Sequence, residues 1–191
     1  MSNYRRAKVK GGTYFFTVIT HLRQPYFQHQ QAREALREAL HAIRIQHPFQ
    51  IDAWVLLPDH LHCIWTLPED DADFALRWSL IKRSVSKNCL ALIDSNLLTP
   101  AQWKNNEFGF WQRRYWEHQI RNENDYARHV DYLHWNPVKH GYVDGVKEWP
   151  YSTFHRFVDD GVYSLDWGIT TKVNNDSAFG EWWRTSPPYF S

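Results

Sequence analysis

The chain has 191 residues, enough for one domain with a sizeable core, and its 22 basic and 21 acidic residues give a formal net charge of +1. This balance excludes a protein that acts mainly as a polybasic arm or an acidic tail, and two cysteines exclude a disulfide-stapled secreted scaffold. Its longest apolar stretches, such as residues 14–19, are too short for a membrane span or a signal peptide, which predicts a cytoplasmic protein.

The chain begins with a predicted strand and a predicted helix. Residues 13–19 are rich in β-branched and aromatic side chains, as strands are. Residues 29–47 predict a helix because apolar residues recur at i, i+4, i+8 and i+11 from Ala32. Pro48 ends that helix, since proline cannot continue the hydrogen-bond ladder.

A β-hairpin is predicted next. Apolar residues alternate along 49–57, which predicts a strand with every second residue from Ile51 to Leu57 on one face. Pro58-Asp59 provides a tight turn, and residues 60–65 then form an antiparallel partner.

The second half predicts a helix, a loop and a further strand. Residues 71–88 carry an apolar stripe that begins at Phe74 and is typical of a helix. Residues 95–109 have the composition of a loop. Residues 111–120 are expected to form another strand.

The last predicted helix begins at an Asn122 or Asn124 cap and runs to Trp135, where the following Asn136-Pro137 ends it. A hairpin between two helix-linked strands predicts an α+β fold of the ferredoxin-like, split βαβ type. The first two helices cover one face of its sheet, and the other face is left for a site.

The segment His60-Leu61-His62 is the sharpest chemical feature. On a strand, residues two apart project from the same face about 6.5–7 Å apart, so two imidazoles can converge on one metal ion. The alternative is a pair of ordinary histidines near a turn. The turn before this segment and the apolar strand after it favour the metal site.

The predicted helix over 122–135 provides a candidate nucleophile. Tyr132 and Asn136 lie about 40° apart on one helix face, so a phenol and an amide oxygen can serve one metal site. Tyr126 lies about 120° from Tyr132 and cannot serve the same site in the same way. His129 is within a turn of Tyr132 and is a rival ligand, and a purely structural role in the core is the alternative for all of these side chains.

Basic and aromatic residues alternate in several segments. Such mixtures suit single-stranded or hairpin nucleic acid, because cations meet phosphates and rings stack on unpaired bases. A solvated surface around a tryptophan-rich core is the alternative. The DNA-binding candidates are Arg5, Arg6, Lys8, Lys10, Lys82, Arg83 and Arg114.

Taken together, the sequence resembles the REP-associated tyrosine transposases, a group of single-tyrosine HUH transposases. The resemblance runs from residue 4 to about residue 157. It rests on blocks in the same order at residues 4–6 with 11–18, 53–65, 110–118, 129–141 and 149–155.

The resemblance implies a ferredoxin-like fold and cleavage and joining of DNA strands at repetitive extragenic palindromes. By motif matching, His60 and His62 would bind the metal, Tyr132 would be the nucleophile, and Asn136 would take the place of the third ligand. Mg²⁺ is the expected cofactor, with Mn²⁺ as a good substitute. The partner would be single-stranded DNA with REP-type hairpins, and the products a 5′-phosphotyrosine and a free 3′-hydroxyl.

Several rival hypotheses stay open at this point. One is a hairpin-binding protein that has lost catalysis, and another is a zinc hydrolase that uses His60, His62 and His129. Residues 1–156 are expected to form the transposase domain. Residues 157–191 form a tail with five acidic and two basic residues, which could dock on the body or inhibit it by competing with DNA. A monomer is favoured over a dimer.

Overall fold

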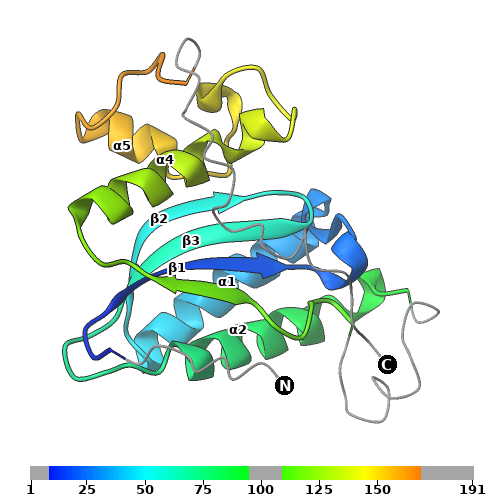
Figure 1. Cartoon of the computed structure of the whole chain (residues 1–191). Coiled ribbons are helices and arrows are strands. Elements are labelled where there is room, and N and C mark those ends of the chain that lie inside the picture. Colours follow the sequence, from blue (N-terminus) through cyan, green and yellow to red (C-terminus); the bar gives the residue numbers. More distant parts are fainter. Residues whose placement is uncertain (1–8, 95–108, 169–191) are drawn as a thin grey trace, which may run out of the picture.

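A computed structural model describes residues 9–94 and 109–168 of the chain, and within them four strands form one antiparallel sheet (Figure 1). The spatial order is β2-β3-β1-β4, which is the order of a ferredoxin-like fold and confirms the predicted fold class. The strands are β1 (Thr13–Ile19), β2 (Gln50–Leu56), β3 (His60–Thr66) and β4 (Trp116–Gln119).

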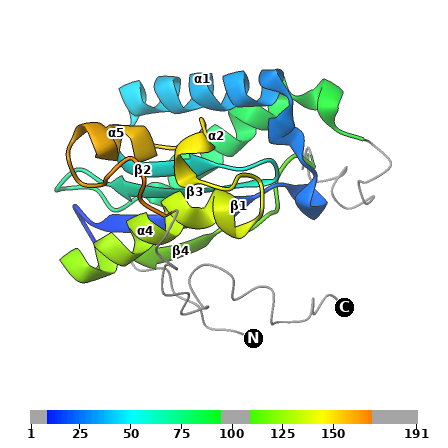
Figure 2. The ribbon, with the colours of Figure 1, turned by 90° about the horizontal axis from the view of Figure 1, so that it is seen from above.

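Helices cover both faces of this sheet. Seen from above, α1 and α2 lie on one face and α4 on the other (Figure 2). The α-helices are α1 (Gln30–Gln46), α2 (Phe74–Asn88), α4 (Glu123–Lys139) and α5 (Phe154–Asp159). Short 3₁₀ turns lie at His21–Arg23, Tyr26–Gln28, Leu90–Leu92 and Val146–Glu148. No helix in the described ranges is long and apolar enough to cross a membrane.

The larger core lies between the sheet and helices α1 and α2. Because side chains alternate along a strand, Phe16 of β1 and Trp65 of β3 point to this face together with their second neighbours. Trp65 stacks on Trp78 of α2 with ring centroids 4.2 Å apart. This layer fixes the strand register, since a one-residue slip would turn all these rings to the opposite face.

The second core lies between the sheet and α4. Phe15 and Ile64, which alternate with the residues of the first core, pack there against Val130 and Leu133 of α4. Both faces of β1 and β3 are therefore covered, and these strands are buried along almost their whole length. The site described below lies within this second layer.

Two predicted strands differ from those observed. In β2 a register shift between Ile51 and Ala53 turns Ile51 to the α1 face, so the predicted alternation from Ile51 to Leu57 is wrong at its first residue. The strand predicted over 111–120 is reduced to β4, because the ammonium of Lys82 takes the carbonyl oxygens of Gln112 and Arg113.

The predicted end of the last helix is also wrong. Asn122 caps α4, as expected, but α4 continues through Pro137 to Lys139, and Gly141 follows its C-cap residue, His140. Gly141 has φ +70°, and the N–H of Tyr142 donates to the carbonyl of Pro137 while that of Gly141 donates to Val138. This Schellman motif ends the helix one turn later than the local preference before proline predicts.

Helix α5 crosses the boundary expected between residues 156 and 157. Phe157 packs in the second core, and Tyr163 packs against it with ring centroids 5.9 Å apart. The folded body therefore includes the first part of the predicted tail. Residues 169–191, on which the rest of the tail hypothesis depends, lie outside the described residues.

Candidate active site

The two histidines of β3 point toward α4 and are buried. Each side chain belongs to a residue only 2 % exposed, and the ring centroids are 5.0 Å apart with planes nearly perpendicular. Leu61 between them points to the opposite core. The strand therefore brings the two imidazoles together on one face, as the His-x-His spacing predicts.

Each imidazole is oriented by a hydrogen bond through its Nδ1 atom. His60 Nδ1 lies 2.6 Å from Oδ1 of Asp59, and His62 Nδ1 lies 2.9 Å from the hydroxyl of Thr17 on β1. With Nδ1–H as the donor in both contacts, the lone pair of each Nε2 is left to face the site. This is how metal-binding histidines are commonly held.

The charges around the pair keep the supporting carboxylate ionised. Arg23 donates to Oδ2 of Asp59 at 2.6 Å. Burial alone would raise the pKa of Asp59, but the hydrogen bonds and charges of His60 and Arg23 outweigh it and lower that pKa to about 2. Asp59 is thus a carboxylate at neutral pH and can accept the Nδ1 proton of His60.

His62 is kept neutral. Burial lowers its pKa well below the ordinary value, and nearby positive charges, first that of His60, act in the same direction. A neutral imidazole has a lone pair available, whereas an imidazolium does not.

Helix α4 brings Tyr132 to this pair. The ring centroid of Tyr132 lies 5.3 Å from that of His62, and Tyr132 is 8 % exposed. The ammonium of Lys139, two turns along the helix, lies 4.9 Å from the centre of the Tyr132 ring. A phenol, a lysine cation and two imidazoles therefore share one small region.

Asn136 lies between these contacts on the same helix. It is fully buried, and neither its amide oxygen nor its amide nitrogen has a hydrogen-bond partner in the described part of the chain. A buried amide without partners costs about 1–3 kcal/mol per polar group, so native proteins rarely keep one without a reason. An oxygen so placed is a suitable ligand for a divalent cation.

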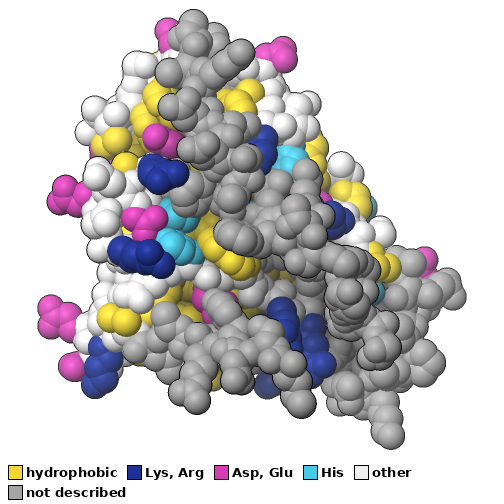
Figure 3. Space-filling model, in the orientation of Figure 1, with side chains coloured by type: hydrophobic (Ala, Val, Ile, Leu, Met, Phe, Trp, Pro, Cys, Tyr) yellow, Lys and Arg dark blue, Asp and Glu magenta, His cyan; other side chains and the backbone are white. Residues whose placement is uncertain are grey.

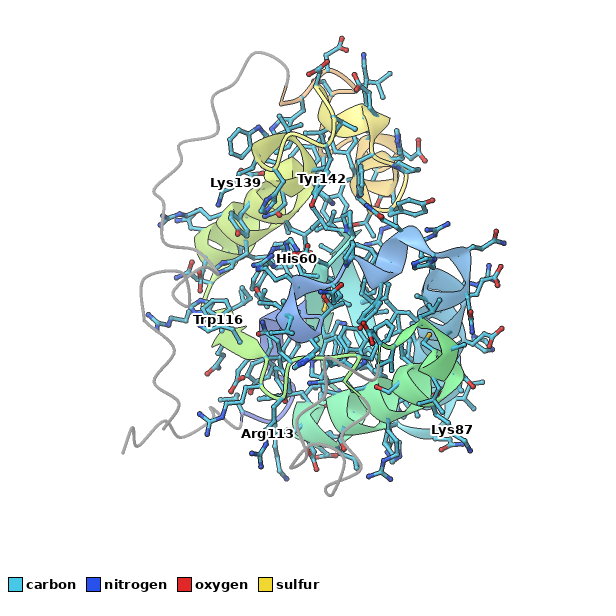
Figure 4. All side chains as sticks on the ribbon, turned by 90° about the vertical axis from the view of Figure 1, so that its right-hand side faces the viewer. His60, Lys87, Arg113, Trp116, Lys139 and Tyr142 are labelled. Atoms are coloured by element: carbon cyan, nitrogen blue, oxygen red, sulfur yellow. The ribbon has the colours of Figure 1, made fainter. Side chains whose placement is uncertain are left out.

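The segment that follows α4 closes the site from the side. The ring of His140 lies 5.2 Å from that of His60, and Figure 4 shows Lys139 and Tyr142 above the labelled His60. Lys139 and His140 were missed as site residues by sequence reasoning. The signal was helical spacing, since they follow Tyr132 by seven and eight residues, but it was hidden by ending the helix at Pro137.

Comparison with known proteins decides the family. The chain is 48% identical over 167 residues to the REP-associated tyrosine transposase of Escherichia coli K12, which covers 87% of this chain and 91% of that protein. The chain belongs to the REP-associated tyrosine transposases. A relative from Haemophilus influenzae is 43% identical over 172 residues, covering 88% of this chain and 94% of the relative. No family model matches the chain.

A solved structure supports the same family. It is a REP-associated tyrosine transposase bound to a REP hairpin, with a TM-score of 0.75 and 45% sequence identity. The match covers 90% of this chain and 94% of the other. The resemblance found in the sequence blocks is therefore confirmed, and so is the ferredoxin-like fold.

In this transposase, His129 does not join the histidine pair. The ring of Phe15 lies 4.9 Å from that of His129 and 5.4 Å from that of His62, and so packs against both. Within residues 9–94 and 109–168, the one group of three His, Cys, Asp or Glu side chains close enough to share a metal is His118, Asp125 and His129. The zinc site predicted by the rival hypothesis, with His60, His62 and His129, is therefore not formed.

The group of His118, Asp125 and His129 fastens β4 to α4. Asp125 lies 2.9 Å from Nε2 of His118, and its backbone carbonyl lies 2.7 Å from Nδ1 of His129. The two rings stack at 4.6 Å with planes only 16° apart. The in-plane lone pairs of rings stacked in this way run parallel and do not meet at one ion, so we interpret the group as a structural link.

The predicted DNA-binding residues have different environments. Lys10, Arg83 and Arg114 are exposed, whereas Lys82 holds the carbonyls of residues 112 and 113. On the face seen in Figure 3, lysine and arginine side chains lie beside histidines. Three of the predicted residues lie outside the described residues, namely Arg5, Arg6 and Lys8.

Proposed function

We propose that this protein is a metal-dependent endonuclease and strand transferase that acts on single-stranded DNA at REP-type hairpins. The proposed intermediate is a covalent 5′-phosphotyrosine on Tyr132. Membership of the tyrosine transposase family and the hairpin bound by its structural relative support this substrate.

One observation supports the proposal most strongly. The ring centroid of Tyr132 lies 5.3 Å from that of His62, one of the two paired imidazoles. The next turn of the same helix carries a buried amide that has no hydrogen-bond partner among the described residues. A packing role alone would explain the tyrosine ring but not the amide, because an apolar side chain would fill that space at lower cost.

His60, His62 and Asn136 are the proposed ligands for Mg²⁺ or Mn²⁺. Two imidazole nitrogens and one amide oxygen carry no negative charge, so the ion keeps its full charge toward a phosphate oxygen. When bound, the ion supplies Lewis-acid polarisation of the scissile phosphate. The buried amide of Asn136 and the oriented Nε2 atoms fit such an ion.

The chain's own residues carry the bond changes. The Tyr132 oxygen attacks the phosphorus and releases its proton to water, while the bond from phosphorus to the 3′ oxygen breaks. The departing oxygen takes a proton from water and becomes a 3′-hydroxyl, so the protons balance. The Lys139 ammonium, 4.9 Å from the tyrosine ring, stabilises negative charge that develops on the phenol oxygen. Attack by a 3′-hydroxyl on the phosphotyrosine reverses the step and joins strands, because the ester bond has been exchanged and not hydrolysed.

A covalent adduct is the direct test. The protein is incubated with a labelled single strand that carries a REP-type hairpin, with Mn²⁺ or Mg²⁺, and the products are separated under denaturing conditions. We expect a labelled protein–DNA adduct that disappears with chelator. It should also be lost in Tyr132→Phe and in His60→Ala.

Tyr126→Phe is the matched control, since it removes a hydroxyl from a second tyrosine of the same helix, one that is half-buried. This variant should form the adduct at the normal rate. An adduct that persists in Tyr132→Phe, or one that forms equally in chelator, would refute the assigned nucleophile or the assigned metal. Binding of the hairpin without any cleavage would leave only the non-catalytic hypothesis.

A further inference from the structure

A row of aromatic rings leads from the histidine pair across the molecule. The rings follow one another from His60 to His140 at 5.2 Å, to Tyr142 at 5.9 Å, to Trp149 at 5.5 Å and to Tyr151 at 5.9 Å. The pairs His140–Tyr142 and Tyr142–Trp149 are stacked within 30° of parallel. The row therefore starts at the active site and ends near the edge strand β2.

Two rings of this row are open to solvent. Tyr142 is 43 % exposed and Tyr151 is 40 % exposed. Within residues 9–94 and 109–168, no other phenylalanine, tyrosine or tryptophan is exposed. Their place in one stacked row that begins at the histidine pair points to a binding role.

The row is held rigidly against β2. The indole N–H of Trp149 donates to the carbonyl of Leu56 at 3.0 Å, and the N–H of Leu56 donates to the carbonyl of Tyr151 at 2.8 Å. Val55 and Ser152 form a β-bridge. The exposed rings are therefore preorganised, and a ligand that stacks on them would not have to order the segment.

The far end of the row opens into a groove that is lined by both basic and apolar side chains. The guanidinium of Arg33 lies 5.0 Å over the Tyr151 ring, and Tyr151 lines a cavity of about 630 Å³ between α1 and β2. Basic and histidine residues occur at i, i+4, i+8 and i+11 along α1, which places them on one side of the helix. They are Arg33, Arg37, His41 and Arg44, and all four line the cavity.

Not all of these cations have the same role. Arg33 donates to the carbonyls of Phe27 and Gln28 and is fixed in place. Arg37 is exposed and has no hydrogen-bond or ion-pair partner among the residues that the structure describes. The acidic side chain at the rim, Glu34, is bonded to Gln30. The groove thus has a surplus of positive charge with at least one cation available to an anion.

We propose that single-stranded DNA flanking the hairpin leaves the active site over Tyr142 and Tyr151 and enters the groove between α1 and β2. Unpaired bases stack on the two rings, and the backbone phosphates meet the arginines of α1. Alternation of cations with stacking rings is the general means of binding single strands. Continuity with the active site favours the DNA flank over an acidic peptide. This path rests on the proposed function, because it takes the DNA of that reaction as its ligand.

Affinity as a function of flank length tests the path. Fluorescence anisotropy is measured on a Tyr132→Phe background, to prevent cleavage, with one hairpin and single-stranded flanks of increasing length. We expect the affinity to rise with length to a plateau. Tyr142→Ala with Tyr151→Ala should weaken binding of the long-flank substrate about tenfold or more, because stacking on one aromatic ring is worth roughly 1–3 kcal/mol per base. Binding of the hairpin without a flank should not change.

Matched variants distinguish base stacking and local charge in the groove from a general change in the protein's net charge or stability. Tyr151→Phe keeps the ring and should retain the length dependence. Arg37→Glu should weaken long-flank binding, whereas Lys87→Glu, the same charge change at an exposed position of α2, should have a smaller effect. An equal loss of long-flank affinity in both charge variants would show that only long-range electrostatics is involved. It would overturn the proposal that the DNA enters this groove.

Crosslinking tests directly whether the flank passes over the two exposed rings. Flanks with 5-iododeoxyuridine at successive positions should crosslink to peptides that contain Tyr142 or Tyr151. Crosslinks confined to α2, or a length dependence that persists in the double alanine variant, would overturn the path. Adduct formation by the unmodified protein on a short-flank substrate is measured in parallel, so failure of the chemistry is distinguishable from failure of the path.

Discussion

Replacing Asn136 by leucine should stabilise the metal-free protein while abolishing its reaction. Leucine keeps a side chain of similar size and removes two polar groups that are fully buried and have no partner in the described part of the chain. Because each such group costs about 1–3 kcal/mol, the free energy of unfolding should rise by at least ~1 kcal/mol. For a chain of this length that corresponds to about 2–4 °C in Tm per kcal/mol.

The same substitution should remove the response to metal. An ion that binds only the folded state at a hundred times its Kd raises the free energy of unfolding by about 2.7 kcal/mol. Thermal unfolding followed with and without Mn²⁺ should therefore show a clear shift for the unmodified protein and little or none for Asn136→Leu. Adduct formation by the variant should be lost.

A control asparagine shows whether the effect belongs to the site. Asn88→Leu changes an exposed amide at the end of α2 and should alter neither the metal shift nor the adduct. If Asn136→Leu lowers Tm without metal, the amide has partners in solution and the reasoning from its burial fails. A variant that keeps the full Mn²⁺ shift would show that Asn136 is not a ligand.

Three further predictions follow from charge, backbone and pH. Lys139→Gln should slow adduct formation about tenfold in single-turnover labelling, with little change in Tm. It removes the charge over the tyrosine ring and keeps a polar side chain only one atom shorter. Gly141 and Gly161 both have φ near +70° with open space around an added Cβ, so Gly141→Ala and Gly161→Ala should each lower the free energy of unfolding in urea by about 1–2 kcal/mol. Only Gly141→Ala should also slow adduct formation. Equal rates of adduct formation in the two variants would show that the end of α4 does not affect the site. Hydrogen bonding to Arg77 lowers the pKa of Asp71 below its ordinary value, so the stability that this pair contributes is present above pH ~4 and is lost as the pH falls below it. Asp71→Asn should therefore flatten that part of the curve of unfolding free energy against pH. An unchanged curve would contradict the role of this pair.

The fold could be predicted from local patterns where several signals agree. The apolar rows of β1 and β3 gave the central strands, and the spacing of α1 and α2 gave the layer over one face. The bulge at Ile51 and the shortening of β4 could not be predicted, because both depend on partners distant in sequence. The ammonium of Lys82, for instance, takes two carbonyl oxygens about thirty residues away.

The sequence predicted which side chains come together in the site, but not the residues that orient them. Side chains two residues apart on a strand share a face, which placed His60 and His62 together. The 3.6 residues per turn of a helix placed Tyr132 and Asn136 on one face. The hydroxyl of Thr17 beside His62 comes from a neighbouring strand and has no local signal. Their roles in metal binding and catalysis stay predictions until the adduct and metal experiments are done.

Pro137 shows how one local rule can hide functional residues. Helical conformation at the residue before a proline costs free energy. In α4 this cost is outweighed by the Schellman motif at Gly141 and by the packing of the helix on the sheet. Ending the helix early removed Lys139 and His140 from consideration. A glycine four residues after the proline was the signal for the longer helix.

Helix α4 carries the phenol and the amide one turn apart, so the spacing between them cannot be adjusted without unwinding the helix. What can vary is the position of the whole helix relative to β3. A slide or tilt of α4 would withdraw both groups from the imidazoles together, and its return would restore both. The position of this one helix on the sheet therefore decides whether the candidate site is assembled, and the two side chains cannot be withdrawn one at a time by moving it.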